Sequence, residues 1–342
     1  ENRRMVGIIT RADIIRVEAD KLNGETEQTG PQPEPSYIVY QTRSPSTGRG
    51  RILVPIANPQ TAELLLQMAA AIARDRDYEL ECIQVILVSR RSSPAETSVQ
   101  TGKSRKLLRQ AEVIAKKQKI PVHTQIRVAH DTAQAILETI KEQHIDILLM
   151  GWKGNTITPG RIFGNVVDTL IRQAPCDVVL VKFGEESGVG RGGFGNPPVR
   201  ESEFRIPNYD RWLVPMAGGP NAKVAIKLLP PLVSLGEQPE IHLCQVFESK
   251  EAKPDLSVLQ QAIRYLVKYR QLSGKVTAVP VVSSSVADGL INLVKSEDFD
   301  VVVLGASREG MLQNAIKGNI PAQIANRVDS TVILVRGEID SK

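Results

Sequence analysis

The chain has 342 residues, a formal net charge of +5, 24% charged residues and 4% aromatic residues. This length suffices for two domains of ordinary size, and the small positive charge with few aromatic side chains argues against nucleic-acid binding. The sequence contains no run of about 18 apolar residues and no signal-peptide pattern, so we expect a cytoplasmic location. Three scattered cysteines without CxxC spacing are expected to be small buried side chains in a reducing compartment: Cys82, Cys176 and Cys244.

The stretch MVGIITRADIIRVEAD, from Met5, combines a strand-like apolar run with a helix-like tail. It is too short to bury a core of its own. Gly7, Thr10 and Asp13 match the pattern G-x-x-T-x-x-D, and residues 1–21 resemble the closing segment of a CBS domain. The resemblance implies that the chain is cut from a larger protein. The alternative is a separate N-terminal hairpin or helix.

Two segments rich in Gly, Pro and polar residues predict linkers at 22–50 and 185–208. They leave candidate domains at 51–184 and 209–337, and a tail at 338–342. The second linker formally contains G-x-G-x-x-G, but no helical pattern follows it. We therefore interpret it as a flexible joint and not as a dinucleotide fingerprint.

The two candidate domains repeat one another in sequence. The segment DTAQAILETIKEQHIDILLMG, from Asp131, aligns with SVADGLINLVKSEDFDVVVLG, from Ser285. A Gly-Asn pair and the last apolar run, DVVLVK or TVILVR, align at the same offset of 154 residues. RILVPIANP aligns with RWLVPMAGG at a slightly larger offset. A shared offset over several motifs indicates two fused copies of one domain.

Each copy alternates short apolar runs with helical patterns. Val/Ile/Leu-rich strands that alternate with helices predict an α/β fold, in which a five-stranded parallel-type sheet carries helices on both faces. Ligands of such Rossmann-like sheets bind at the carboxyl ends of the strands, where the winding reverses. In the first copy the expected strands are 51–57, 80–88, 122–128, 146–151 and 177–183, and the expected helices are 62–74, 104–118, 132–143 and 166–173.

A glycine pattern follows the expected strand that ends at Gly151. Gly154 lies in the next loop, and Gly164 with Asn165 stands where the next helix begins. A helix N-terminus offers unpaired N–H groups and a partial positive charge, which suit a phosphate. Two basic residues of the same loop add positive charge: Lys153 and Arg161. The alternative is a glycine-rich loop with an Asn helix cap and no ligand.

The spacing G-x2-G-x9-G, followed by a small polar residue after an apolar strand, resembles the universal stress protein family. The resemblance covers roughly 51–183 and 211–336, and it implies two repeated adenine nucleotide α-hydrolase-like domains. In nucleotide-binding members the glycine motif holds ribose and phosphates, and an Asp after the first strand contacts the nucleotide. The nucleotide-binding positions that it implies here are Ile56, Ala57, Asn58, Gly151, Lys153, Gly154, Arg161, Gly164 and Asn165 in the first copy, and Ala217, Gly218, Gly305, Arg308, Gly318 and Asn319 in the second.

The chain departs from this pattern at several positions. Ala57 and Ala217 stand about where the Asp is expected, and Asn follows the last glycine where Ser or Thr is usual. Arg308 replaces the middle glycine of the second copy. It could pair with a phosphate, fill the site, or bind a carboxylate of the other repeat. Binding of ATP, ADP or AMP is therefore expected chiefly in the first copy.

CBS and universal stress domains both occur as cytosolic attachments to membrane transporters. Their combination resembles the C-terminal tails of bacterial, cyanobacterial-type chloride-channel family proteins. The resemblance predicts a regulatory module, not an enzyme, at the cytoplasmic face of the membrane, with the transporter part of the same full-length chain as its partner. One alternative is a ligand-free scaffold or dimerisation module. Another is a weak nucleotide hydrolase, which the missing acidic groups disfavour.

Two further expectations concern assembly and surface charge. Members of the family commonly pair through their last strands, so DVVLVK and TVILVR are expected to pair within the chain as a pseudo-dimer, and the whole chain could form a homodimer. The segment GKSRKLLRQAEVIAKKQK predicts a helix with one face on the sheet and a solvated basic face, or else contact with an anionic membrane. The histidines lack metal-ligand spacing, so we expect no metal and place them at the surface or at helix caps: His123, His130, His144 and His242.

Overall fold

The computed structural model describes residues 34–153, 162–184, 209–216, 218–248, 255–268, 275–306 and 319–338. Residues 1–21, which carry the CBS-like motif, lie outside these ranges, as does the linker expected at 185–208. The CBS resemblance therefore stays a prediction. None of the helices within the described ranges combines the length and the apolar character that crossing a bilayer requires.

The first repeat follows the predicted alternation, with one strand added in front of it. Its strands are β1 (Tyr37–Thr42), β2 (Gly50–Pro55), β3 (Tyr78–Leu87), β4 (Val122–Ala129), β5 (Ile147–Gly151) and β6 (Asp177–Lys182). Its helices are α2 (Pro59–Arg76), α3 (Gly102–Gln118), α4 (Thr132–Gln143) and α5 (Asn165–Gln173).

The second repeat has the same order of elements. Its strands are β7 (Arg211–Pro215), β8 (Glu240–Phe247), β9 (Lys275–Val282), β10 (Val301–Gly305) and β11 (Thr331–Arg336). Its helices are α6 (Pro220–Val233), α7 (Ser257–Lys268), α8 (Val286–Glu297) and α10 (Ile320–Arg327).

The equivalent helices α4 and α8 begin and end by the same local devices. The side chains of Asp131 and Ser285 accept a backbone N–H at the start of α4 and α8. Both helices then end on a left-handed residue, His144 with φ 49° and Asp298 with φ 49°. The placement of His144 at a helix cap is thereby confirmed. In these two helices the repeats therefore match in backbone conformation as well as in sequence.

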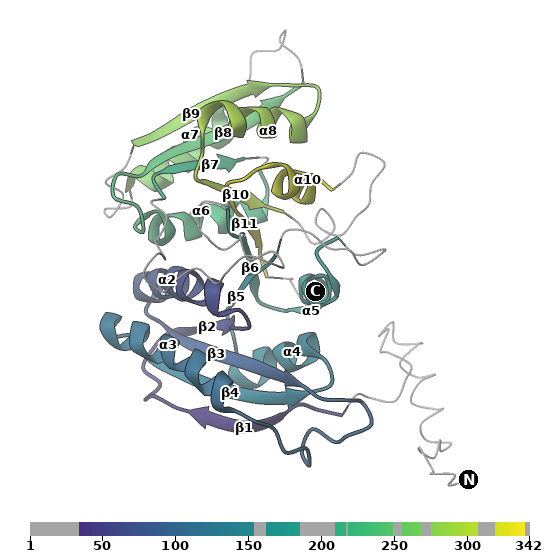
Figure 1. Cartoon of the computed structure of the whole chain (residues 1–342). Coiled ribbons are helices and arrows are strands. Elements are labelled where there is room, and N and C mark those ends of the chain that lie inside the picture. Colours follow the sequence, from purple (N-terminus) through teal and green to yellow (C-terminus); the bar gives the residue numbers. More distant parts are fainter. Residues whose placement is uncertain are drawn as a thin grey trace, which may run out of the picture.

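All strands belong to one 11-stranded sheet, in the order β1-β4-β3-β2-β5-β6-β11-β10-β7-β8-β9 (Figure 1). The core strands of each repeat are parallel, and the winding reverses between β2 and β5 and between β7 and β10. β6 and β11 pair antiparallel, with Leu180 opposite Leu334. The expected pairing of the two last strands is confirmed, and it joins the two sheets into one.

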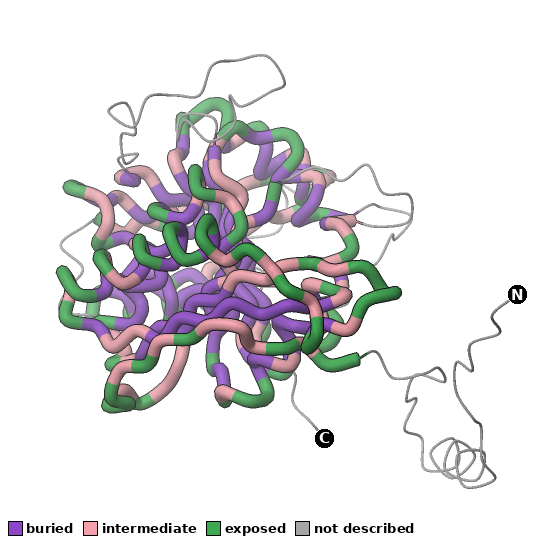
Figure 2. The backbone as a smooth tube through the Cα atoms, turned by 60° about the horizontal axis from the view of Figure 1, so that its bottom comes forward, coloured by how far each residue is buried: buried purple, intermediate pink, exposed green. Residues whose placement is uncertain are grey.

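Helices cover both faces of this sheet. The apolar core under α2, α3, α6 and α7 runs across both repeats, and so does the core under α4, α5, α8 and α10. α2 also contacts α6 across the junction. Figure 2 shows buried backbone through the middle of the molecule and exposed segments mainly toward the outside. The predicted α/β class with helices on both faces is confirmed.

The linker expected at 22–50 is wrong for part of its length, because β1 lies within it. β1 pairs antiparallel with β4, with Tyr37 opposite Val128 and Thr42 opposite Thr124. The run YIVY has strand-forming residues, and β4 would otherwise leave a row of unpaired backbone groups. In the second repeat β9 ends the sheet, and no described strand lies on its outer edge.

Two expectations about side chains are also confirmed. The three cysteines are buried and unpaired, and burial raises the pKa of the thiols of Cys176 and Cys244 to about 12. α3 buries one apolar side, including Leu107, Leu108 and Ala111, while its basic residues remain mostly exposed.

Candidate functional site

The candidate site of the first repeat lies at the carboxyl ends of β2 and β5, where the winding reverses. Ile56 follows β2 and is buried, and its N–H donates to the carbonyl oxygen of Ile83 at 2.8 Å. The side-chain oxygen of Asn58 accepts the N–H of Gln60 at 3.0 Å and caps α2. Ile56 and Asn58 thus hold the loop in place, and Ala57 between them is exposed.

The two ends of the loop after β5 are held by a backbone hydrogen bond and by an aromatic contact. The N–H of Trp152 donates to the carbonyl oxygen of Val181 at 2.8 Å. The indole ring of Trp152 meets the ring of Phe163 edge-on, with centroids 4.8 Å apart. Its Nε1 is buried, and none of the described residues accepts its hydrogen. Lys153 is exposed next to it. Two residues of the predicted site lie outside the described residues: Gly154 and Arg161.

The N-terminus of α5 lacks a side-chain cap among the described residues. Its N-cap is Gly164, with φ 100° and ψ 161°, a conformation that residues with a Cβ rarely adopt. Instead the buried carboxylate of Asp168 reaches back and accepts the N–H groups of Ile162 and Phe163 at 3.1 and 2.9 Å. Asn165 is exposed at the first helical position. The helix therefore presents its first N–H groups to an incoming anion.

The equivalent helix of the second repeat, α10, has a side-chain N-cap. Asn319 is the N-cap of α10, and its side-chain oxygen accepts the N–H of Ala322 at 2.9 Å. Its side chain is buried. Asn319 is thus engaged as a helix cap, and its assignment as a nucleotide-binding residue stays a prediction.

The end of β10 also lies closer to α6 than the end of β5 lies to α2. A Cβ on Gly305, at the end of β10, would lie 2.7 Å from the backbone carbon of Asn221 in α6. A Cβ on its counterpart Gly151 would meet only side-chain atoms, Cδ1 of Leu65 at 3.2 Å and Oγ1 of Thr61 at 3.9 Å. Close packing of β10 on the backbone of α6 accounts for a glycine at position 305, and its assignment to a nucleotide site stays a prediction. Three other predicted positions of this repeat lie outside the described residues: Ala217, Arg308 and Gly318.

Sequence reasoning missed a cluster of charged residues, which we call the β1 network. Its members on β3 and β4 are buried, and those on β2 and α4 are partly exposed. Glu79 accepts the N–H of Gly48 at 2.8 Å, the Nε–H of Arg51 at 3.1 Å, and contacts Nε2 of His123 at 2.9 Å. Burial raises the pKa of Glu79, but these hydrogen bonds outweigh it and hold the pKa below its usual value. The expectation that His123 lies at the surface or at a helix cap is wrong, because Glu79 provides it with a buried partner.

The same network continues to β1. Arg127 is buried and donates to the hydroxyl oxygen of Ser36 at 2.9 Å, and it pairs with Glu142 of α4. Arg43, just after β1, pairs with the buried Glu81 at 3.0 Å. Burial raises the pKa of Glu81, and the nearby Arg43 opposes that rise. The signal in the sequence was the period-two placement of polar residues in ELE and HTQIR, which puts them on one face of the sheet.

Comparison with known proteins agrees with this architecture. The model of the universal stress protein family matches residues 48–182 and 208–336, and the chain belongs to that family. A universal stress protein from Archaeoglobus fulgidus has a similar fold, with a TM-score of 0.56 and 15% identity over 85% of this chain and 97% of that chain. The cytoplasmic domain of a prokaryotic cation chloride cotransporter has a TM-score of 0.50 and 11% identity, over 84% and 95% of the two chains.

A curated relative is similar in sequence as well. The Na(+)/H(+) antiporter NhaS5 of Synechocystis sp. is 29% identical over 140 residues. The match covers 41% of this chain and only 20% of the antiporter. The similarity is therefore confined to one part of the transporter.

Proposed function

We propose that the first repeat binds the phosphates of an adenine nucleotide at the N-terminus of α5. The observation that carries this proposal is the start of α5 behind Gly164, which none of the described side chains caps and which the carboxylate of Asp168 holds in position. Unpaired N–H groups and the helix dipole attract an anion there, and Lys153 adds a positive charge beside them. In the second repeat Asn319 caps α10, and β10 packs closely on α6 at Gly305. We therefore expect no nucleotide at the equivalent place of this repeat.

The adenine part of this proposal rests on the family, in which the glycine motif holds ribose and phosphates. Since Ala57 stands where an Asp is expected, the base and ribose gain no carboxylate contact from this position. The phosphates would then contribute most of the affinity, and affinity should rise from AMP to ATP because more negative charge meets the helix N-terminus.

The role that we propose is regulation of a membrane transporter to which the chain is attached, on the cytoplasmic side. The similarity to part of a Na(+)/H(+) antiporter supports attachment to a transporter, and the CBS-like motif favours the chloride-channel type. A nucleotide would bias the transporter through different affinities for its conformational states. No catalytic step is part of this role, and sustained release of phosphate from ATP by the purified chain would contradict it.

The test is thermal unfolding of the purified chain with ATP, ADP and AMP, compared with two matched variants. A ligand at about 100 times its Kd stabilises the folded state by about 2.7 kcal/mol, which is several degrees of melting temperature. Asn165→Asp places a negative charge at the proposed phosphate site and should abolish the shift. Asn319→Asp makes the same change in the second repeat, where Asp is also a good N-cap, and should retain the shift.

Asn165→Asp is informative because it does not weaken the helix. An acidic residue in the first turn of a helix stabilises it by about 0.3–1 kcal/mol. A variant that folds at least as well as the wild type and has lost its response to nucleotide supports the proposal. An unchanged response in Asn165→Asp, or no response in the wild type, would leave the ligand-free scaffold as the better account.

A further inference from the structure

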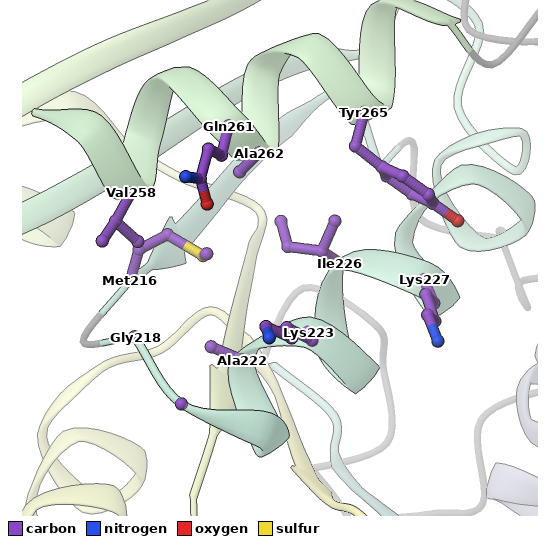
Figure 3. A pocket seen from close by; sticks show the side chains of 11 residues that line it. Met216, Gly218, Ala222, Lys223, Ile226, Lys227, Val258, Gln261, Ala262 and Tyr265 are labelled. Atoms are coloured by element: carbon purple, nitrogen blue, oxygen red, sulfur yellow. The ribbon is translucent and has the colours of Figure 1, made fainter.

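A cavity of about 360 Å³ lies between α6 and α7 of the second repeat (Figure 3). Its wall is mainly apolar and is formed by Met216, Ala222, Ile226, Val258 and Ala262. Met216 and Gln261 point into it from one side and Ile226 from the other (Figure 3). This volume is near the lower end of the range for small-molecule sites, about 300–1,000 Å³, so the cavity fits a small ligand.

The rim of the cavity is positively charged. Lys223 and Lys227 both line it from α6, and both are exposed. They are four residues apart, so their side chains lie on the same face of the helix. None of the described residues that line the cavity is acidic. Gly218 also lines the cavity, and a Cβ on it would meet none of the described atoms within 4 Å.

The first repeat provides an internal comparison, because its equivalent helices pack together. Contacts between α2 and α3 are more extensive than those between α6 and α7. The register RILVP to RWLVP places Glu63 and Gln67 of α2 where α6 has Lys223 and Lys227. In the first repeat the two helices therefore pack against each other. In the second repeat a mainly apolar cavity with two lysines at its rim lies between them.

We propose that this cavity binds a small amphiphilic anion, with a single apolar chain or ring between α6 and α7 and a carboxylate or phosphate on Lys223 and Lys227. The apolar body would cover the wall at Ile226 and Ala262, and the head group would neutralise two like charges that otherwise repel each other. The site is separate from the proposed nucleotide site, which lies in the other repeat at α5.

The experiment is titration of the purified chain with 8-anilinonaphthalene-1-sulfonate, a fluorescent aromatic sulfonate, followed by competition with octyl phosphate and octylammonium. We expect saturable binding at one site, displacement by octyl phosphate, and none by octylammonium. The double variant Lys223→Gln/Lys227→Gln should weaken octyl phosphate by about tenfold, since it removes both cations from an exposed rim where each ion pair contributes modestly. Its charge-matched control is Lys103→Gln/Lys106→Gln, two exposed lysines on α3, which should bind like the wild type.

A second variant tests the apolar half of the site. Gln261 is exposed on α7 and points into the cavity, so Gln261→Trp fills the space without replacing a core residue. We expect it to block the sulfonate while its melting temperature stays close to that of the wild type. Asn165→Asp should leave this binding unchanged, which separates a failure of this site from a failure of the nucleotide site. Absence of saturable binding, displacement by octylammonium, or full affinity in both cavity variants would overturn the proposal.

Discussion

The two repeats share one fold but differ at the outer edge of the sheet and at the N-terminus of the last helix. In the first repeat β1 covers the outer edge of β4, and none of the described side chains caps the N-terminus of α5. In the second repeat β9 ends the described sheet, and Asn319 closes the N-terminus of α10. The two copies of one fold therefore differ in a few side chains at the start of α5 and α10, and in the cavity that lies between α6 and α7.

The largest expected effect concerns the β1 network, which has no counterpart among the described residues of the second repeat. Glu79→Gln removes a buried carboxylate from Arg51 and His123, and should lower the free energy of unfolding by about 3 kcal/mol. The matched change Glu240→Gln affects a carboxylate that is 45% exposed, and should cost less than about 1 kcal/mol. Urea unfolding monitored by circular dichroism measures both. Equal losses would mean that the β1 network adds nothing particular to the first repeat.

The same carboxylate predicts a pH dependence with a definite sign. Because the pKa of Glu79 is lower in the folded chain than its usual value, the stability that it contributes is present above the unfolded pKa. This stability is lost as the pH falls through the folded pKa. The wild type should therefore lose more stability on acidification than Glu79→Gln, as measured by urea midpoints at a series of acidic pH values. Parallel curves for the two proteins would argue against the assigned cause.

The next effect tests the difference in width between the two crevices. Gly305→Ala drives a Cβ against the backbone of α6 and should destabilise the second repeat by about 2 kcal/mol. Gly151→Ala meets most closely the end of the Leu65 side chain, which can move by a few tenths of an ångström, and should cost less than about 1 kcal/mol. The difference between their urea midpoints is the measurement. A larger loss in Gly151→Ala would reverse the comparison.

A smaller effect separates the two asparagines. Asn319→Ala removes the N-cap of α10 and should cost about 1 kcal/mol. Asn165→Ala changes an exposed residue at the first position of α5, and its cost should be close to zero. Thermal unfolding without ligand measures the pair. Similar losses for both variants would indicate that Asn165 also caps its helix.

Much of the fold could be predicted from the sequence because its signals are local or repeated. Val/Ile/Leu-rich strands alternating with helical patterns, together with the shared offset of 154 residues, predicted two parallel sheets with helices on both faces. The pairing of β6 with β11 followed from the family resemblance and is confirmed, and the structure shows that it is antiparallel. β1 was missed because its apolar run is short and lies among Pro and Ser residues, and its partner β4 is distant in the chain.

The sequence alone indicated where a candidate site would lie in each repeat, but not how the two places differ. Gly151 and Gly305 occupy equivalent positions, and so do Asn165 and Asn319. What distinguishes them is the distance between a strand end and a neighbouring helix, and whether Asn stands at the N-cap or one residue later. These properties depend on tertiary packing of about an ångström, which residue spacing does not encode. The cavity between α6 and α7 depends on helix separation in the same way.

The number of nucleotides bound per chain tests the central claim, that the two repeats differ in their binding site, most directly. Equilibrium dialysis with ATP at saturating concentration should give one nucleotide per chain for the wild type and for Asn319→Asp, and none for Asn165→Asp. Two nucleotides per chain in the wild type, or loss of binding in Asn319→Asp with retention in Asn165→Asp, would contradict it.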